Sequence, residues 1–132
     1  MYYNCRGIFM EKIRRLPDSE FEIMNILWDL EDPIDRSQIE ERLFEKHPIA
    51  LTTLLTLLTR LSEKGFLRIE KKGRRSSYYK LIDRKDYLSS QSSSFFRQLC
   101  NGDVRVFANA LCDSDLSKED LAQLSKLLEG KD

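Results

Sequence analysis

A leucine- and threonine-rich run at residues 51–64 constrains the fold of this chain more than any other segment. It reads LTTLLTLLTRLSEK and is followed by Gly65, at the position where a left-handed helix C-cap is expected. At about 100° per residue, four leucines (Leu54, Leu57, Leu58, Leu61) fall on one side and the threonines and Arg60 on the other. The run therefore predicts an amphipathic helix with a threonine face.

The threonine face needs an explanation, because threonine is a mediocre helix former. Four threonines on the outer side of one helix lower its stability unless that side contacts something. Contact with a ligand or partner is one explanation, and packing within the fold is the alternative.

Two shorter helices are predicted before this run. The first begins near Asp18 or Ser19, after Pro17, and the sequence Glu31-Asp32-Pro33 ends it. The second is capped by Asp35 or Ser37 and stops at His47-Pro48. Their apolar residues recur at helical spacing and are expected to face a core: Phe21, Met24, Ile26, Leu27 and Trp28 in the first helix, and Ile39, Leu43 and Phe44 in the second.

After Gly65 the period changes from that of a helix to that of a strand. The segments FLRIEKK and SSYYKLI read as two strands around Gly73-Arg74-Arg75, with Leu67 and Ile69 alternating against charged neighbours. Three helices followed by a basic-tipped hairpin is the order of a winged helix-turn-helix.

Helical spacing returns after Asp83, interrupted by the serine-rich SSQSSS, and predicts three short apolar helices. A chain of 132 residues that is 41% hydrophobic can bury one modest core, so these helices need another surface to cover them. Self-association as a homodimer is the expected solution, and a cap folded back on the N-terminal domain is the alternative. The residues expected at the dimer interface are Tyr87, Leu88, Phe95, Phe96, Leu99, Phe107, Leu111, Leu121, Leu124 and Leu128.

The predicted fold class is mostly α with a small β-hairpin, in three parts. Residues 1–15 form an N-terminal extension with no assigned fold, expected to be poorly ordered, and Met10 is an alternative start. Residues 16–82 form the winged-helix domain, and residues 83–132 the helical dimerisation region.

Charge is unevenly distributed along a chain whose net charge is zero. Residues 17–46 carry three bases against ten acids, whereas residues 60–80 carry eight bases against two acids. A surface patterned in this way can meet phosphate at one place and repel it elsewhere. Solvated surface charge is the alternative reading.

Double-stranded DNA is the expected partner of the third helix and the hairpin. Short threonine side chains can hydrogen-bond base edges or touch a thymine methyl, and basic residues can meet phosphate. We expect Tyr78 to donate to a phosphate oxygen and Tyr79 to pack inward. The predicted contacts are Thr52, Thr53 and Thr56 to bases, Arg60 and Lys64 to phosphate, and Arg74, Arg75, Ser76, Ser77 and Tyr78 at the wing.

Neither enzyme chemistry nor a metal site is expected. The single histidine, His47, precedes a proline at a helix end, and no serine or cysteine has an activating context. The cysteines Cys5, Cys100 and Cys112 form no CxxC or CxC pair, so we interpret them as buried small hydrophobes and expect no cofactor. No apolar stretch is long enough to span a membrane and no secretion signal is evident, so a cytoplasmic protein without membrane insertion is expected.

Residues 16–129 closely resemble the penicillinase-repressor family, known as BlaI/MecI/CopY. The resemblance is carried by LPDSEFEIMNILW, LTTLLTLLTRLSEKGFL, GRRSSYYKLI and LSKEDLAQLSKLLE. It implies a homodimer on an inverted-repeat operator that represses resistance or other genes.

Departures from the family pattern also carry information. Family members often have basic residues where Thr52 and Leu55 stand and an N-capping serine at Ala50, which suggests a different operator or weaker binding here. Antibiotic-responsive members are cut at an Asn-Phe bond through a membrane sensor-protease system. The matching pair is Asn109–Ala110, a candidate proteolytic site that keeps only the asparagine. The paired CxC motifs of copper-responsive members are absent, which disfavours copper release.

The expected function is therefore that of a homodimeric repressor that blocks a promoter sterically. Two alternatives remain open: a winged-helix module that binds protein, and a metal- or thiol-responsive sensor.

Overall fold

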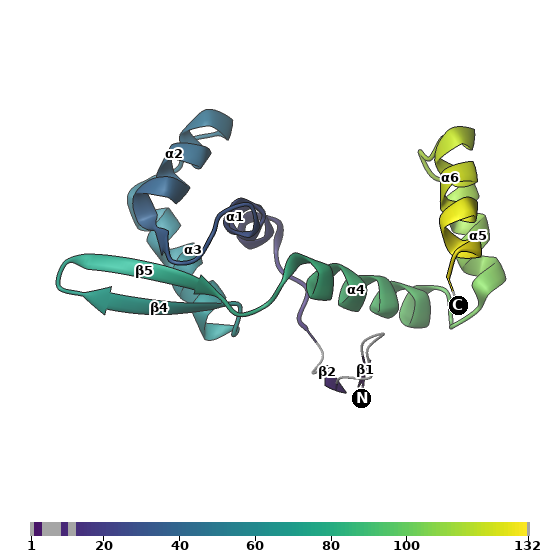
Figure 1. The fold of residues 1–132 in the computed structure, drawn as a ribbon, viewed down its shortest axis with the longest axis horizontal. Coiled ribbons are helices and arrows are strands. Elements are labelled where there is room, and N and C mark those ends of the chain that lie inside the picture. The colour runs from purple at the N-terminus through teal and green to yellow at the C-terminus, as the bar shows by residue number, and fades with distance from the viewer. Residues whose placement is uncertain (1, 4–8, 11–12, 132) are drawn as a thin grey trace. The chain divides into compact units, whose positions relative to one another are not determined.

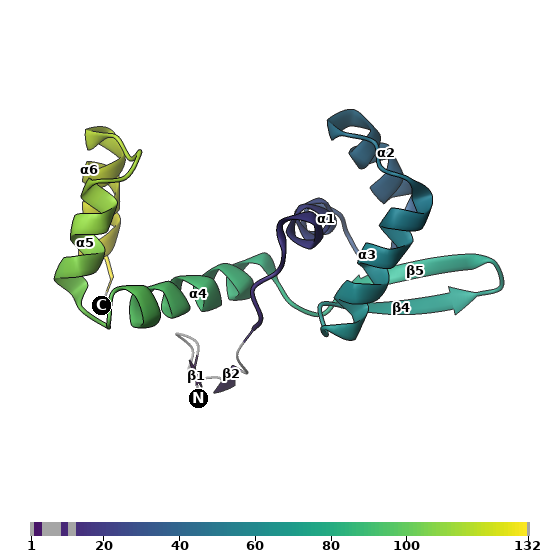
Figure 2. The ribbon, with the colours of Figure 1, turned by 180° about the vertical axis from the view of Figure 1, so that it is seen from behind.

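The structure is a computed structural model that describes residues 2–3, 9–10 and 13–131 (Figures 1 and 2). The chain divides into two compact units, Met1–Gln91 and Ser92–Asp132. The division lies inside a helix, whereas the sequence predicted it before that helix begins.

The first unit is a winged helix-turn-helix, which confirms the predicted fold class. Three helices are followed by a two-stranded hairpin, and a further short strand pairs with the hairpin (Figure 1). The elements are α1 (Asp18–Trp28), β3 (Ile34–Asp35), α2 (Arg36–Lys46), α3 (Leu51–Glu63), β4 (Leu67–Lys72) and β5 (Arg75–Lys80), and the antiparallel sheet has the order β3-β5-β4.

Strand β3 was not predicted from the sequence. It places Ile34 opposite Tyr78 and Asp35 opposite Ser77. A strand of two residues shows no alternation that a pattern could reveal. It matters because it joins the start of α2 to the wing.

Local interactions explain where the helices begin and end. Asp35, one of the two predicted candidates, is the N-cap of α2, and its backbone N–H donates to Gln38 Oε1 at 2.9 Å. Helix α3 ends at Glu63 with Lys64 as its C-cap, and the following Gly65 has a φ of +82°, the left-handed conformation expected there. The backbone N–H of Phe66 then donates to the carbonyl of Leu61 at 2.9 Å, which closes the cap.

The core of the first unit contains the leucine side of α3. Leu54, Leu57, Leu58 and Leu61 are all buried, as their spacing predicts. Phe44, expected to face the core, is instead 75% exposed, because Ile39 and Leu43 already occupy the buried side of α2. The other buried apolar residues include Ile23, Met24, Leu27, Ile34, Phe66 and Leu67.

Tyr87 also belongs to this core, so its predicted place at a dimer interface is wrong. It lies in α4 (Arg84–Ser94), is 3% exposed, and its hydroxyl accepts a hydrogen bond from the backbone N–H of Leu16 at 2.9 Å. Its ring centroid is 5.6–5.7 Å from those of Phe21, Trp28 and Phe66. Helical spacing identified the apolar face but not the surface that covers it.

Two further contacts attach the start of α4 to α1. Arg84 pairs with Asp29 at 3.0 Å, and its hydrogen bond and charge hold the pKa of Asp29 below its usual value. The indole N–H of Trp28 donates to the carbonyl of Ile82 at 2.9 Å. The first turn of α4 is therefore part of the packing of the first unit.

The expected interruption at SSQSSS is also wrong. Helix α4 continues through the serines to Ser94 and passes into a short π-helix, η1 (Phe95–Leu99). Serine is only a moderately poor helix former, and the run contains no glycine or proline that would break the helix.

The second unit contains the remaining helices, α5 (Val104–Cys112) and α6 (Lys118–Glu129). Asp103 caps α5, and Ser117 caps α6 in a capping box with Asp120. Phe107 packs edge-on against Phe95 and Phe96, with ring centroids 5.9 and 5.7 Å away. Among the described residues of this unit, only Cys100 is a buried apolar residue.

Near the N-terminus, where no fold was assigned, β1 (Tyr2–Tyr3) pairs with β2 (Phe9–Met10) in antiparallel register. Cys5 and its expected burial lie outside the described residues. Within the part of the chain that the structure describes, no helix is long and apolar enough to cross a membrane.

Replacing Tyr87 by phenylalanine should lower the free energy of unfolding by about 1–3 kcal/mol, because the buried Leu16 N–H loses its acceptor. Tyr79→Phe is the matched control, since its half-buried ring contacts Arg68 and its hydroxyl makes no hydrogen bond to another described residue, and it should change stability by less than about 0.5 kcal/mol. Urea denaturation of both variants measures the difference. Equal stabilities would show that the Tyr87 hydroxyl is dispensable.

Candidate nucleic-acid interface

The threonine face of α3 is open to solvent. Thr52, Thr53 and Thr56 are exposed, and so are Thr59 and Arg60 on the same side. The hydroxyl of Thr56 donates to the carbonyl of Thr52, and that of Thr59 to the carbonyl of Leu55, each at 2.9 Å. The three threonines predicted to contact bases thus lie together on one exposed surface.

The N-terminal end of α3 has no side-chain cap. Ala50 stands at the N-cap with φ −63° and ψ 145°, and it accepts no hydrogen bond through a side chain. Leu51, the first residue of the helix, is 46% exposed. The N-cap and the first helical residue therefore have apolar side chains, although they lie at the positive end of the helix dipole.

Lys64 does not lie free beside the threonine face. Its Nζ atom is 2.6 Å from Oε1 of Glu20, and the two side chains are 22% and 3% exposed. Glu20 is the one charged residue buried among the described residues, so Lys64 neutralises it. The predicted phosphate contact of Lys64 conflicts with this pairing, and Arg60 is the exposed cation of α3.

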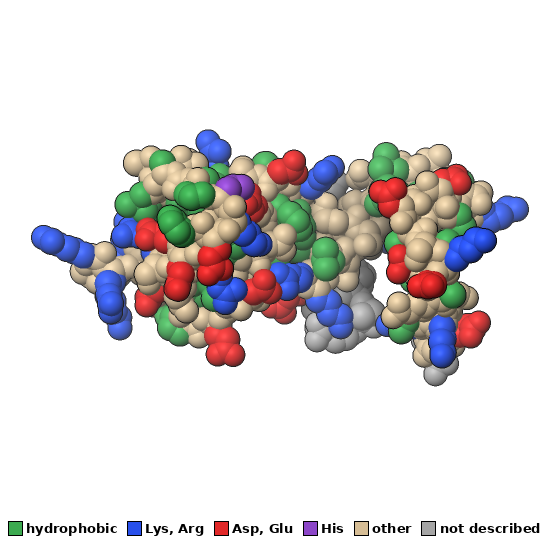
Figure 3. Space-filling model, turned by 90° about the horizontal axis from the view of Figure 1, so that it is seen from above, with side chains coloured by type: hydrophobic (Ala, Val, Ile, Leu, Met, Phe, Trp, Pro, Cys, Tyr) green, Lys and Arg blue, Asp and Glu red, His purple; other side chains and the backbone are tan. Residues whose placement is uncertain are grey.

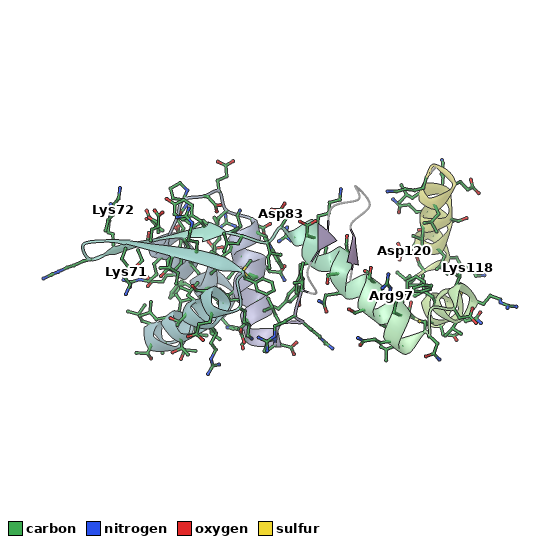
Figure 4. All side chains as sticks on the ribbon, turned by 90° about the horizontal axis from the view of Figure 1, so that it is seen from below. Lys71, Lys72, Asp83, Arg97, Lys118 and Asp120 are labelled. Atoms are coloured by element: carbon green, nitrogen blue, oxygen red, sulfur yellow. The ribbon has the colours of Figure 1, made fainter. Side chains whose placement is uncertain are left out.

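The wing carries a cluster of exposed cations. Arg74 and Arg75 are exposed and Ser76 and Ser77 are half-buried. Lys and Arg side chains project from the hairpin tip at the left of Figure 3. Figure 4 labels Lys71 and Lys72, which project from the same hairpin and which the predicted contacts did not include.

The two wing tyrosines have the opposite orientation to the one predicted. Tyr78 is 2% exposed and lies opposite Ile34 and Ile69 in the sheet, and burial raises its pKa. Tyr79 is half-buried, with the guanidinium of Arg68 4.1 Å from its ring centre. Successive side chains of β5 point to opposite faces of the sheet, and the face that carries Ile34 and Ile69 is the one that points into the core. Tyr78 is therefore a core residue.

A hollow separates the start of α2 from the wing tip. It is lined by three arginines, two serines and two acidic residues. One of the acidic residues, Glu40, forms an ion pair with Arg36 at 3.1 Å. Arg36 and Ser37 were not among the predicted contacts, because only the unpredicted pairing of β3 with β5 brings them to the wing. The lining residues are Asp35, Arg36, Ser37, Glu40, Arg74, Arg75 and Ser76.

The predicted dimerisation residues other than Tyr87 are exposed or half-buried. Leu99 is 70% and Leu128 is 61% exposed. Leu88 and Phe95 are also exposed, whereas Phe96, Phe107, Leu111, Leu121 and Leu124 are half-buried. The candidate cleavage pair, Asn109 and Ala110, is exposed but lies inside helix α5.

No metal-binding cluster of three or more His, Cys, Asp or Glu residues occurs among the residues that the structure describes. Cys100 is buried as expected, but Cys112 is exposed, which contradicts its prediction as a buried hydrophobe. His47 lies 2.8 Å from Glu22, a contact between the end of α2 and α1.

Replacing Lys64 by methionine should lower the free energy of unfolding, because Glu20 is left buried without a partner. The expected loss is about 1–3 kcal/mol, less than for a fully buried pair, because the Lys64 side chain is 22% exposed. The double variant Glu20→Leu, Lys64→Met should recover most of that loss, as hydrophobic replacements of buried pairs often do. Guanidinium denaturation measures both. A Lys64→Met protein of unchanged stability whose DNA binding depends less on salt would identify Lys64 as a phosphate contact instead.

Comparisons with known proteins agree with this geometry. The penicillinase repressor family matches residues 16–130. A penicillinase repressor of Bacillus licheniformis is 32% identical over 121 residues, covering 91% of this chain and 94% of its own length. The methicillin resistance regulatory protein MecI of Staphylococcus aureus (strain N315) is 29% identical over 121 residues, covering 91% of this chain and 98% of MecI.

A solved structure supports the same assignment. The solution structure of the DNA binding domain of the repressor BlaI matches with a TM-score of 0.50 and 33% identity, covering 59% of this chain and 94% of that domain. These relatives are named as repressors and regulators rather than enzymes. With its winged helix, its threonine-faced helix and a match over nearly its whole length, this chain belongs to the penicillinase repressor family.

Proposed function

We propose that this protein is a sequence-specific transcriptional repressor that binds an inverted-repeat operator as a homodimer. The observation that carries the proposal is the exposed threonine face of α3 beside a basic wing, on a unit that has its own buried core. A face of mediocre helix formers that stays exposed among the described residues of its unit is explained by a ligand.

Helix α3 enters the major groove in this proposal. Thr52, Thr53 and Thr56 lie within its first two turns, where a recognition helix approaches base edges. Arg60 lies about one turn further along and meets the phosphate backbone. The acidic excess of residues 17–46 disfavours DNA contact over most of α1 and α2.

The wing and the hollow beside it supply contacts to the backbone. Arg74 and Arg75 reach phosphate or the adjacent minor groove, and Arg36 extends the same basic surface from α2. These contacts hold the protein in register but do not read sequence.

The second unit supplies the dimer. Its helices carry apolar side chains at every turn, yet among its described residues only Cys100 is a buried apolar side chain. Three exposed leucines (Leu99, Leu127 and Leu128) would cost about 1.5 kcal/mol or more each if left in water. A second copy of the same face covers them, as in most two-fold dimers.

The mechanism that follows is steric. A two-fold dimer presents two α3 helices to two half-sites about one turn of DNA apart. A protein seated across both half-sites denies the overlapping promoter to polymerase. Dimerisation is then part of the affinity, because each half-site alone binds weakly.

A fluorescence-anisotropy titration of the full chain tests this proposal. The probes are a duplex carrying the DNA upstream of its own coding sequence and a scrambled duplex, each at two salt concentrations. Selective binding of two protomers per site, weakened by salt, is the expected result. Equal weak binding to both duplexes would contradict it and favour a protein-interaction module.

The dimer is tested by Leu128→Asp, which places a charge on the exposed leucine face of α6. Ala122→Asp is the matched control, an exposed residue on the side of the same helix away from its leucines. Leu128→Asp should give a monomeric mass in sedimentation and weaker operator binding, with Ala122→Asp unchanged. A Leu128→Asp protein that stays dimeric would exclude this face as the interface.

Variants of the wing and variants of α3 should affect DNA binding in different ways. Arg74→Ala with Arg75→Ala should weaken binding to all duplexes and reduce the slope of log affinity against log salt by about 1–2. Thr53→Ala should leave that slope unchanged and shift preference at one base pair by about 1 kcal/mol. Binding measured across a panel of single-base operator variants distinguishes them, and uniform losses from both would refute the division.

A further inference from the structure

The first two turns of α3 hold none of the side chains that read guanine or adenine by paired hydrogen bonds. From Leu51 to Thr59 the helix contains only leucine and threonine. Bidentate readout of guanine uses arginine or lysine, and that of adenine uses asparagine or glutamine. This helix must therefore distinguish bases in another way.

The threonine hydroxyls are themselves restricted. Those of Thr56 and Thr59 donate their single hydrogen to backbone carbonyls one turn earlier, at 2.9 Å. Each oxygen can still accept a hydrogen bond, but it has no hydrogen left for an acceptor such as guanine O6. The methyl groups of these two threonines remain as apolar contacts.

An apolar edge borders the threonine face. Leu51 is 46% exposed and Leu55 is partly exposed one turn later, whereas Leu54 and Leu58 are buried. At about 100° per residue, Leu51 and Leu55 lie next to Thr52 and Thr59 on the helix surface. Exposed leucines at the leading end of the helix are unexplained by the core of this unit.

We propose that the first two turns of α3 recognise thymine through its 5-methyl group, with Leu51 as a specificity-determining residue. This inference rests on the proposed function and names the chemistry of its half-site. The apolar edge and the threonine methyls fit thymine methyls, and a threonine oxygen that only accepts fits the N6 amino group of the paired adenine. The half-site bases facing these turns are therefore A·T pairs with their methyls toward Leu51.

Replacing thymine by uracil tests this directly, because it removes the methyl and keeps every hydrogen-bonding group. The full chain is titrated against a duplex selected from a random-sequence pool, and against the same duplex with single thymines replaced by uracil. Each uracil at a facing position should weaken binding about threefold to fivefold, the value of one buried methyl. The methyl lies in the major groove, so contacts of the wing in the minor groove are unaffected.

The variant Leu51→Ala assigns the effect to this helix. It should weaken binding to the thymine duplex more than to the uracil duplex, so that the ratio of the two affinities falls toward one. Leu81→Ala is the matched control, since Leu81 is 55% exposed in the same unit but follows the hairpin. It should leave the ratio unchanged, and thermal denaturation checks that both variants are folded.

The outcomes separate this inference from the function on which it rests. Selective binding with equal affinity for thymine and uracil duplexes overturns the inference and leaves the repressor proposal standing. An unchanged ratio in Leu51→Ala overturns the role of Leu51. Failure to select any duplex overturns both.

Discussion

The burial of the leucine side of α3 is the constraint on which the DNA-binding unit depends. Leu54, Leu57, Leu58 and Leu61 point into one core with residues of α1, α2 and the sheet, and this fixes the rotation of the helix about its axis. Once that side is buried, Thr52, Thr53 and Thr56 have no direction left except outward. The leucines that stabilise the unit therefore also determine which side of α3 is exposed as the candidate recognition surface.

Periodicity predicted the three helices, the hairpin and the exposed threonines, because each of these follows from which side of one element is apolar. It failed where a long-range partner decides the outcome. Lys64 pairs with Glu20, 44 positions away, and Tyr87 packs on residues from α1, so neither role is visible in its own segment. The orientation of Tyr78 and Tyr79 depends on the register with β3, a strand too short to predict.

The site shows the same division between local and long-range information. The wing arginines were found from their charge, whereas Arg36 joins them only through the pairing of β3 with β5. The contacts of Arg84 with Asp29 and of Trp28 with Ile82 likewise make the start of α4 part of the winged-helix unit. Secondary structure was thus easier to foresee than the neighbours each element would have.

The described residues of the second unit bury almost no apolar side chain. This exposure links the behaviour of the protein to its concentration in the cell. In the proposed homodimer, folding of this unit depends on protein concentration, since dilution removes the partner that covers its exposed apolar side chains. Under the proposed dimer, occupancy of an operator would rise more steeply than in proportion to the amount of protein. The regulated gene would then be derepressed by a modest fall in synthesis of the repressor or a modest rise in its degradation.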